Sequence, residues 1–493
     1  MRNRTFSLCA APLLSAYVVA CAHAPPHIDG VASVPERAGT YWTPPPAAHT
    51  RDSVTRGTVP ADLADHLQHL TLADVIDVAL RNNPATRATW EEARAAAYQL
   101  GAARTRIIPS VDGSVTMSRN KVVSQNGSST ISHRTSYVPQ LSLSFLLLDF
   151  GGRSGAIEVA RQNVFAAGLT HNATVQTTVL DVQVAYFTYM ATKALLTAQQ
   201  SQLTEAQANL AAAQQRHDVG LATIADVLQA KTAVSQAQLA FETTQGNLHA
   251  ARGTLATAMG FPANVAYDIE AHSDQIPVRA VAVSVDSLLN AAVQNRPDLL
   301  AARAEARGAA AQVRIAQSAG LPSITLGGTA GHTYASPTTL SGTTYGLSLG
   351  LQIPLSSALT NRYNVQSSRA LAEVASARAD VVRQQVMQQV FASYYSLQTA
   401  TQRVATADDL LQSATQSEQV ALGRYREGVG SIIDLLTAQS ALADARAQQV
   451  QARWQWATAL AQLAHDAGVL GLHGETPVGL SVPHTLPDST SRQ

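Results

Sequence analysis

The chain has 493 residues, and its 34 Lys and Arg residues balance its 34 Asp and Glu residues. Only 14% of the residues are charged, so the sequence lacks the basic footprint of a nucleic-acid-binding protein and predicts no nucleic-acid partner. Hydrophobic residues make up 46% but aromatic residues only 5%, which favours closely packed helices over a thick globular core.

The N-terminus has the layout of a secretory signal. Two arginines precede an apolar run from Phe6 to Ala20, which predicts a signal peptide over residues 1–20. The run ends in the letters VVAC at Cys21, which resembles the lipobox of bacterial lipoproteins, in which the Cys is acylated. An acylated Cys21 would anchor the chain to one leaflet without spanning it. The alternative is an ordinary signal peptide followed by a chance Cys.

The segment after the signal predicts an extended arm. Residues 21–70 include the run Pro44-Pro45-Pro46, which favours an extended, lipid-anchored N-terminal arm. No other segment reaches the ~18 to 20 uninterrupted apolar residues of a transmembrane helix. A membrane crossing by this chain would therefore be made by strands.

Two parts of the chain repeat each other. The letters LRNNP at 80–84 align with VQNRP at 293–297, and a second pair of blocks begins at Arg216 and Arg424. Such matches at a fixed offset indicate a duplicated unit. The predicted divisions are a first repeat over 71–261, an inter-repeat segment over 262–284, a second repeat over 285–471 and a C-terminal tail over 472–493.

Each repeat begins with a helix and continues as a strand pair. The helix is predicted to end just before Pro109 or Pro322. Beyond each proline, hydrophobic residues alternate with Ser, Thr and Gly, which predicts strands with one apolar and one hydroxyl-lined face. The predicted strands are 111–118, 141–147, 324–330 and 345–353. The polar residues 119–136 and the segment around Pro337 are the predicted loops.

A long proline-free stretch follows each strand pair. Hydrophobic residues recur every seven positions from Val182 and from Val390, which predicts a coiled-coil seam. Gly220 and Gly428 each interrupt one stretch once, which predicts the turn of a helical hairpin. At about 1.5 Å per residue, an arm of roughly 60 residues would extend about 90 Å.

Four strands cannot close a sheet in lipid. An open edge in a bilayer leaves backbone amides and carbonyls unpaired at several kcal/mol each, so copies of the chain must complete a barrel. Three copies would supply twelve strands, the smallest such assembly with an open lumen, because side chains fill a barrel of eight. A soluble β-sandwich with a coiled-coil stalk is the alternative.

This order of elements resembles a known family. A helix, a strand pair and a long helical hairpin, repeated twice, resemble the TolC-type outer membrane factors, and the lipobox resembles their OprM/NodT-like lipoprotein branch. The more specific motifs are the letters DFGGR at 149–153 and the two blocks RxxxGxxxxxD[VL]L at 216–228 and 424–436. The implied fold is an α+β membrane protein, a trimeric 12-stranded β-barrel continuous with a long periplasmic α-helical coiled-coil tunnel. The inter-repeat segment would then belong to an equatorial belt.

The resemblance also implies a function. It predicts a homotrimeric exit duct in the outer membrane, anchored in outer-membrane lipid and extending into the periplasm, that passively conducts substrates for a tripartite efflux system. The implied partners are a periplasmic adaptor (membrane fusion) protein and an inner-membrane transporter of RND type. No enzymatic activity, no cofactor and no metal are expected. Alternatives are a duct for type I protein secretion or metal efflux, or a coiled-coil structural surface lipoprotein. Two matched strand pairs with polar faces favour a duct.

The tips of the helical hairpins are the implied gate. In the family, an acid in one hairpin contacts a Tyr or Arg in the other, which maps here to Asp226, Asp434 and Tyr425. Some members carry a basic residue where this chain has Gly430, so Arg216 or Arg424 would supply the cation. Helix N-capping is the alternative role of the two acids.

The turn residues at the tips are the implied adaptor contacts. They are Gly220 and Leu221 in the first hairpin and Gly428 and Val429 in the second. A glycine there permits a tight turn and also a close approach by a partner.

Overall fold

The computed structural model describes residues 70–125, 129–265, 267, 269, 278, 283–336 and 341–470. The predicted signal peptide, Cys21, most of the N-terminal arm and the C-terminal tail lie outside the described residues. Most of the segment 262–284 also lies outside them.

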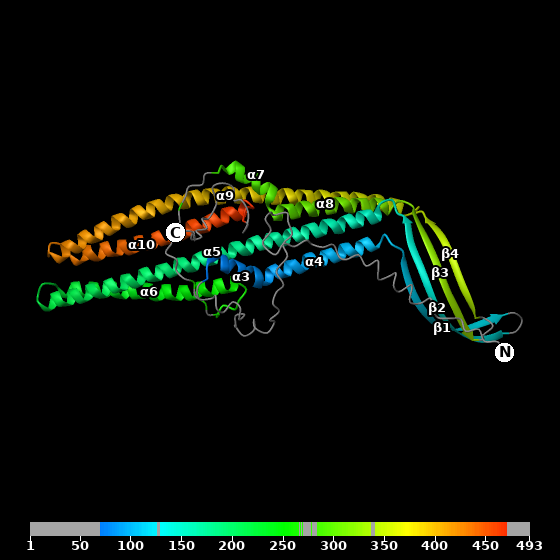
Figure 1. Ribbon diagram of the computed structural model, residues 1–493, viewed down its shortest axis with the longest axis horizontal. Helices are drawn as coiled ribbons and strands as arrows, with labels where there is room; N and C mark the ends of the chain where they lie inside the picture. The colour runs from blue at the N-terminus through cyan, green and yellow to red at the C-terminus, as the bar shows by residue number, and fades with distance from the viewer. Residues whose placement is uncertain are drawn as a thin grey trace, which may run out of the picture. The chain divides into compact units, whose positions relative to one another are not determined.

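The strands form one antiparallel sheet in the order β1-β2-β3-β4 (Figure 1). They are β1 Ser110–Gln125, β2 Ser129–Leu148, β3 Ser323–Ser336 and β4 Gly342–Gln352. The two repeats thus contribute one strand pair each, and β2 pairs with β3 to join them. β1 and β4 are the edge strands, so each has one side without a strand partner in the single chain.

The first strand pair is longer than the sequence predicted. The polar residues 119–136 are not a loop, because β1 continues to Gln125 and β2 begins at Ser129. Arg119 pairs with Thr135, and the ladder runs on without interruption to Gln125 and Ser129. The prediction was wrong because it followed side-chain hydrophobicity, whereas the backbone ladder continues where the side chains become polar.

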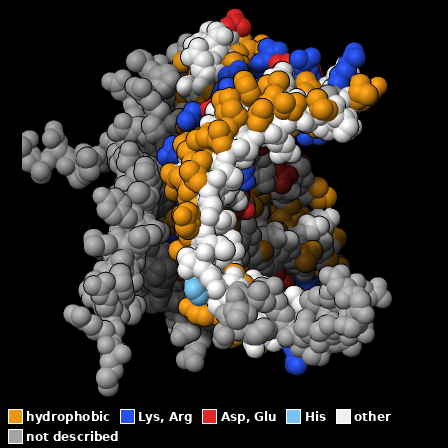
Figure 2. Space-filling model, turned by 90° about the vertical axis from the view of Figure 1, so that its right-hand side faces the viewer, with side chains coloured by type: hydrophobic (Ala, Val, Ile, Leu, Met, Phe, Trp, Pro, Cys, Tyr) orange, Lys and Arg blue, Asp and Glu red, His pale blue; other side chains and the backbone are white. Residues whose placement is uncertain are grey.

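The sheet has one apolar and one small-polar face. On β4 the residues Tyr345, Leu347, Leu349 and Leu351 are 63 to 89% exposed, and they alternate with Gly and Ser. Figure 2 views the molecule from the side on which the sheet lies and shows hydrophobic side chains along the outer side of a curved band and white atoms along its inner side. A large apolar face left uncovered in one chain needs a partner or a lipid environment.

Two compact units make up the described chain. One contains the sheet and comprises Glu92–Ala167 and Ala301–Asp380, and the other comprises the described residues of Asp29–Glu91, Gly168–Leu300 and Val381–Gln493.

Each repeat opens with two helices, where the sequence predicted one. The short helices are α3 Leu72–Asn82, α4 Pro84–Thr105, α7 Val285–Asn295 and α8 Pro297–Ser318. The break falls at Asn83 and at Arg296, whose backbones are extended with ψ of 123° and 120°. A residue before proline is driven out of the helical region, while proline itself suits the first position of the next helix.

The long helices form the two predicted helical hairpins. They are α5 Gly152–Asp218 with α6 Ile224–Ala258, and α9 Ala358–Arg426 with α10 Ile432–Asp466 (Figure 1). The predicted heptad positions Val182, Tyr189, Val390 and Leu397 are buried. Among the described residues, none of the helices combines the length and apolar composition that a membrane span requires.

Each repeat contains the same close contact, here called the joint, between the end of its second long helix and the end of its first short helix. Gly260 and Gly468 follow α6 and α10 with φ of 84° and 69°. A Cβ at Gly260 would lie 2.7 Å from the carbonyl of Asn82, and one at Gly468 would lie 3.2 Å from the backbone nitrogen of Arg296. Both positions therefore require glycine for backbone conformation and for space.

The joint is neutral in the first repeat and charged in the second. Asn83 Nδ2 donates to the Ala258 carbonyl at 3.3 Å. At the corresponding place Arg296 Nη1 donates to the Asp466 carbonyl at 3.5 Å and lies 3.7 Å from the Asp466 carboxylate.

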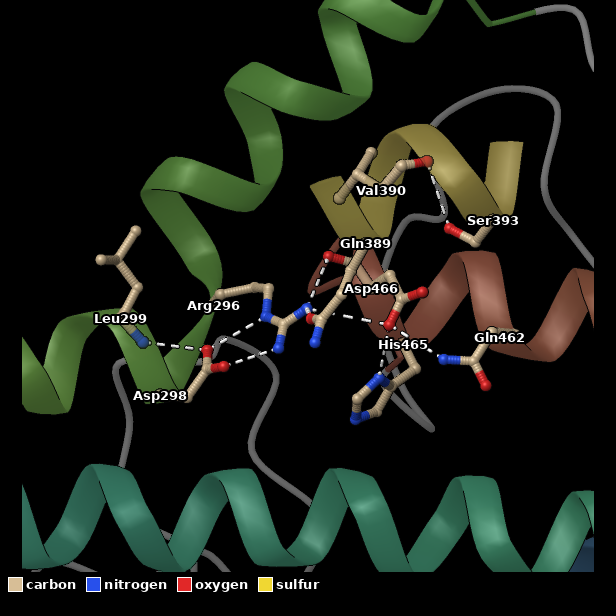
Figure 3. Close-up of polar contacts among 9 residues, drawn as sticks. All are labelled: Arg296, Asp298, Leu299, Gln389, Val390, Ser393, Gln462, His465 and Asp466. Atoms are coloured by element: carbon tan, nitrogen blue, oxygen red, sulfur yellow. Dashed lines mark hydrogen bonds and ion pairs between the residues drawn. The ribbon is translucent and has the colours of Figure 1, made fainter. Parts of the chain in front are cut away.

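Arg296 is the buried centre of a polar network (Figure 3). Its side chain is 8% exposed, and its Nη2 lies 2.6 Å from Asp298 Oδ2. Its Nη1 donates to Gln389 Oε1 at 2.6 Å. Asp466 also contacts His465 Nδ1 at 3.1 Å. The network ties the start of α8 to α9 and to the end of α10.

Candidate functional site

The tip of the first helical hairpin is a Schellman turn. The Leu221 amide donates to the Arg216 carbonyl at 2.7 Å, and the Gly220 amide donates to the His217 carbonyl at 2.9 Å. Gly220 has φ of 78°, the left-handed conformation that this cap requires.

The second tip repeats the same turn. Val429 donates to the Arg424 carbonyl at 3.0 Å and Gly428, with φ of 75°, donates to the Tyr425 carbonyl at 3.2 Å. A Cβ at Gly430 would lie 2.9 Å from Arg424 Cβ and 3.2 Å from its backbone. Gly430, the position at which the family resemblance raised a basic residue, is therefore closely packed against the end of α9.

The two predicted gate acids cap helices. Asp226 accepts from the Thr223 amide at 2.8 Å at the start of α6, and the Asp226 amide donates back to Thr223 Oγ1 at 3.3 Å. Asp434 and Ser431 make the same capping box at the start of α10, with distances of 3.3 and 3.1 Å. The capping interpretation therefore accounts for both carboxylates in this structure, and a gating role for them stays a prediction.

Arg216 joins the two hairpins. Its Nη1 donates to the Tyr425 carbonyl at 2.8 Å, and its Cζ lies 4.7 Å from the centre of the Tyr425 ring. The Tyr425 hydroxyl is buried without a hydrogen-bond partner among the described residues. Arg424 is exposed. Of the two predicted cations, Arg216 is thus the one that bridges the hairpins, through the Tyr425 backbone and ring.

A small apolar cluster lies beside this contact. Its buried residues are Ala213, Ala230 and Ile432, which come from α5, α6 and α10. Tyr425 packs against the same cluster from α9. All four long helices therefore meet near the tips through small side chains.

The sequence did not predict two polar contacts between α5 and α10. Asn209 Nδ2 donates to Gln439 Oε1 at 2.7 Å, and Arg446 Nη1 lies 3.3 Å from Glu205 Oε1. These residues sit in polar stretches that look solvated, and no local spacing indicates which helix from the other repeat will face them.

A groove of about 840 Å³ runs along α5, α6 and α10 beside these contacts. Its lining is rich in glutamine, and the side-chain oxygens of Gln202 and Gln229 are buried without a partner among the described residues. Across the described part of the chain, no group of three or more His, Cys, Asp or Glu side chains could hold a metal ion.

The tips also expose apolar side chains. Leu221 is 71% exposed and Val429 is 69% exposed. In a Schellman turn the residue after the glycine commonly packs back on its own helix. Here these side chains point to solvent at both tips, together with Val219, Ile224 and Ile433.

These features define a class of protein: a membrane channel subunit with a two-faced sheet and paired helical hairpins. The comparison with known families makes the class specific. The chain belongs to the outer membrane efflux protein family, whose model, "Outer membrane efflux protein", matches residues 75–261 and 288–469. The family model matches twice, in agreement with the internal duplication.

Individual relatives agree with the family. The chain is 30% identical over 425 residues to protein CyaE of Bordetella pertussis, covering 84% of this chain and 88% of the relative. It is 26% identical over 388 residues to the toluene efflux pump outer membrane protein TtgC of Pseudomonas putida, covering 76% and 78%. The crystal structure of the CmeC outer membrane channel of Campylobacter jejuni has the same fold, with a TM-score of 0.72, 17% identity and coverage of 90% and 93%.

The chain is therefore an outer-membrane efflux channel of a tripartite pump, and it is not an enzyme. Channels of this family form trimers that extend into the periplasm and work with adaptor and inner-membrane transporter proteins. The predicted fold class is confirmed in its long helices, its four antiparallel strands and its two repeats.

Proposed function

We propose that three copies close a twelve-stranded barrel by pairing β4 of one copy with β1 of the next. The observation that carries this proposal is the sheet itself, which has two unpaired edges, an apolar face suited to lipid and a face of Ser, Thr and Gly suited to water. Closure would pair every edge amide and carbonyl, which a hydrocarbon environment requires.

Conductance tests this duct directly. Purified full-length protein in detergent should be trimeric and should open ion-conducting pores in planar bilayers. Material that stays monomeric and passes no ions would contradict the proposal. The same preparation can be probed with large and small organic cations to measure the width of the narrowest point.

The duct is also proposed to carry a lipid anchor on Cys21 and to belong to the lipoprotein branch of the family. The letters VVAC support this, and an anchor in the outer membrane would add a second attachment to the barrel. Radiolabelled palmitate should enter the wild-type chain and not a Cys21→Ser variant. Equal labelling of both would rule out this Cys as the anchor.

The gate is proposed to lie at the hairpin tips, with Arg216 as the principal link. A charge-assisted hydrogen bond of 2.8 Å and a stacked ring hold the first hairpin against the second. Asp226 and Asp434 would act beside it, first as caps and then, in a trimer, as rings that favour cations. Arg424 at the exposed surface would act only by its charge.

Planar-bilayer recordings of variants separate these roles. Arg216→Ala should raise the conductance of the closed channel, because the link is lost while both Schellman turns remain. Asp226→Ala and Asp434→Ala should lower cation selectivity if the rings form, and unchanged conductance and selectivity in both would limit the acids to capping. Lys231→Ala, on the exposed surface of α6, is the charge-matched control for Arg216→Ala.

The adaptor is proposed to contact the tip turns at Gly220, Leu221, Gly428 and Val429. The support is the exposure of the two apolar side chains, since solvated apolar residues at a turn that recurs in both repeats mark a contact surface. Leu221→Ser with Val429→Ser should weaken co-purification with the cognate adaptor and leave bilayer conductance unchanged. Loss of conductance as well would indicate misfolding instead.

The transporter is proposed to be of the RND type and the cargo to be small organic compounds, as in multidrug efflux. The name of the relative TtgC, a toluene efflux pump outer membrane protein, supports small organic compounds as the cargo. Deleting the gene should raise accumulation of dyes and antibiotics in cells. Retention of a secreted protein or of metal ions in their place would favour type I secretion or metal efflux.

A further inference from the structure

The distal end of the first strand pair, far from the helices, carries positive charge without negative charge. Residues 117–138 contain Arg119, Lys121, His133 and Arg134 but neither Asp nor Glu, although the whole chain has balanced charges. The matching part of the second strand pair, 330–345, contains no Lys, Arg, Asp or Glu. The charge is therefore confined to the first strand pair, where Arg119 and Lys121 are the basic residues whose side chains the structure describes.

A row of amphipathic side chains precedes these cations on the apolar face. Met117 pairs with Tyr137, and Tyr137 pairs with Tyr334 across the next strand. All three are exposed, and the ring of His332 lies 4.3 Å from that of Tyr334. Tyrosines in such a row favour the level at which lipid tails meet headgroups.

Arg119 and Lys121 follow Met117 on the same face of β1. Alternate residues of a strand share a face, so the positions 115, 117, 119 and 121 all point the same way. At a rise of about 3.4 Å per residue, Arg119 lies about 7 Å and Lys121 about 14 Å along the strand beyond the row. Both side chains are exposed, and neither makes an ion pair with any residue that the structure describes.

We propose that Arg119 and Lys121 bind the phosphate groups of phosphorylated glycolipid in the outer leaflet. The inference rests on the proposed function, because it requires strands that cross the outer membrane. Beyond the tyrosine row the strands enter the headgroup layer, where an arginine fork matches a phosphate and a lysine adds a point charge. The aliphatic stems of both residues can lie along the apolar surface below them.

Anionic cargo in the lumen is an unsuitable ligand, because Arg119 and Lys121 lie on the apolar face of the sheet. Cargo in the lumen would meet the hydroxyl face, where Ser118 Oγ and Ser136 Oγ are 2.8 Å apart. Arg119 and Lys121 lie on the opposite face from Ser118, because neighbouring residues of a strand alternate in direction. A trimer would present three such sites, one on each first strand pair.

Lipid retention by the intact trimer tests the proposal. Purified full-length trimers are incubated with mixed micelles of diphosphorylated hexa-acyl lipid A or of the same lipid after phosphatase treatment, and bound lipid is measured by native mass spectrometry. The wild type should retain the phosphorylated lipid preferentially. Arg119→Ser with Lys121→Ser should weaken this retention about 25-fold, since each basic residue near an anionic surface contributes roughly fivefold.

Two control variants keep the outcome interpretable. Lys231→Ser with Arg403→Ser removes the same charge from exposed helix positions and should leave retention unchanged. Arg119→Lys with Lys121→Arg keeps the charge and should retain the lipid. Equal retention of both lipids by the wild type, or unchanged retention by the double Ser variant, would overturn the proposal. If wild-type and variant trimers still conduct ions in that case, only the lipid site is contradicted and the proposed trimeric duct is not. Wild-type chains that form no trimer, or trimers that conduct no ions, would contradict the proposed duct.

Discussion

Single residues show how the two repeats have diverged at one joint. Asn83 and Arg296 occupy the same place at the end of the first short helix of each repeat, and each donates to the end of a long helix. The first repeat uses a neutral amide, and the second uses a buried guanidinium with a buried carboxylate opposite. A buried charge is costly without a partner, and Arg296 lies 2.6 Å from the Asp298 carboxylate and 3.7 Å from that of Asp466, so we expect Arg296 and Asp466 to be energetically coupled.

A double-mutant cycle tests this coupling. Arg296→Asn alone should lower the stability of the trimer by about 2 to 4 kcal/mol, because it removes the buried guanidinium that bridges Asp298 and Asp466 and leaves the Asp466 carboxylate to His465. Adding Asp466→Ala, which recreates the neutral pair of the first repeat, should restore part of the loss. Thermal unfolding of purified trimers followed by circular dichroism measures each step. Strictly additive effects of the two substitutions would contradict the coupling.

Asp466 should also make stability depend on pH. Burial alone would raise the pKa of the Asp466 carboxyl, but hydrogen bonds from His465, Gln462 and Ser393 and the charge of His465 hold it below its usual range. A carboxyl with a lowered folded pKa contributes stability above its unfolded pKa of about 3.9, and this contribution is lost as the pH falls through the folded value.

The measurement compares Asp466→Asn with the wild type between neutral pH and pH 2. The variant should be the less stable at neutral pH, and the gap should close only below about pH 4. A gap that stays constant to pH 2 would show that the carboxylate charge is not what stabilises the joint. Asp444→Asn, at another position on α10, is the matched control.

The residue scale is where the sequence prediction of the site was weakest. A glycine directly after a predicted helix is a strong sequence signal for a turn, and the turns at Gly220 and Gly428 were predicted correctly. Arg216 and Tyr425 were both named, yet the acceptor is the Tyr425 carbonyl, which no side-chain pattern reveals. Asn209 and its partner were missed because contacts between repeats leave no local signal.

At the scale of elements, the joint glycines are a sharp constraint on the long helices. Gly260→Ala should destabilise the protein by about 2 to 4 kcal/mol, because a left-handed backbone disfavours Cβ and the new atom would meet the Asn82 carbonyl. Gly246→Ala, inside α6 with open space around it, should instead be neutral or stabilising by about 0.5 to 1 kcal/mol. Denaturation of the two variants side by side decides this. Equal effects would show that the joint tolerates a side chain.

Elements were predictable where one physical signal dominates. Proline-free stretches and heptads gave the long helices, because uninterrupted backbone hydrogen bonding and a regular seam depend on local sequence. The ends of β1 and β2 were misplaced because strand pairing continues through polar residues. The break at Asn83 was missed although Pro84 follows it, since the proline at 109 was taken as the end of the helix.

At the scale of the whole molecule, neighbouring residues of β4 should respond oppositely to the same charge. Leu349→Lys places a cation on the apolar face and should cost about 2 to 4 kcal/mol of insertion free energy near mid-membrane. Ser348→Lys places it on the hydroxyl face and should leave insertion intact while shifting ion selectivity toward anions. Folding into lipid vesicles and reversal-potential recordings measure the two effects. Equal loss of insertion would mean that the faces are assigned wrongly.

The unlike edges of the sheet have a consequence for how a ring of copies is completed. In the proposed ring β4 of one copy pairs with β1 of the next, so the contact between copies would be head-to-tail and each copy would offer a different edge to each neighbour. A chain with an intact β1 edge but a damaged β4 edge could pair with one neighbour, yet the barrel that contains it could not close. Such a copy would be dominant-negative, because one damaged chain inactivates the two intact chains of its trimer. In a cell that makes both forms, the fraction of inactive trimers would therefore exceed the fraction of damaged chains.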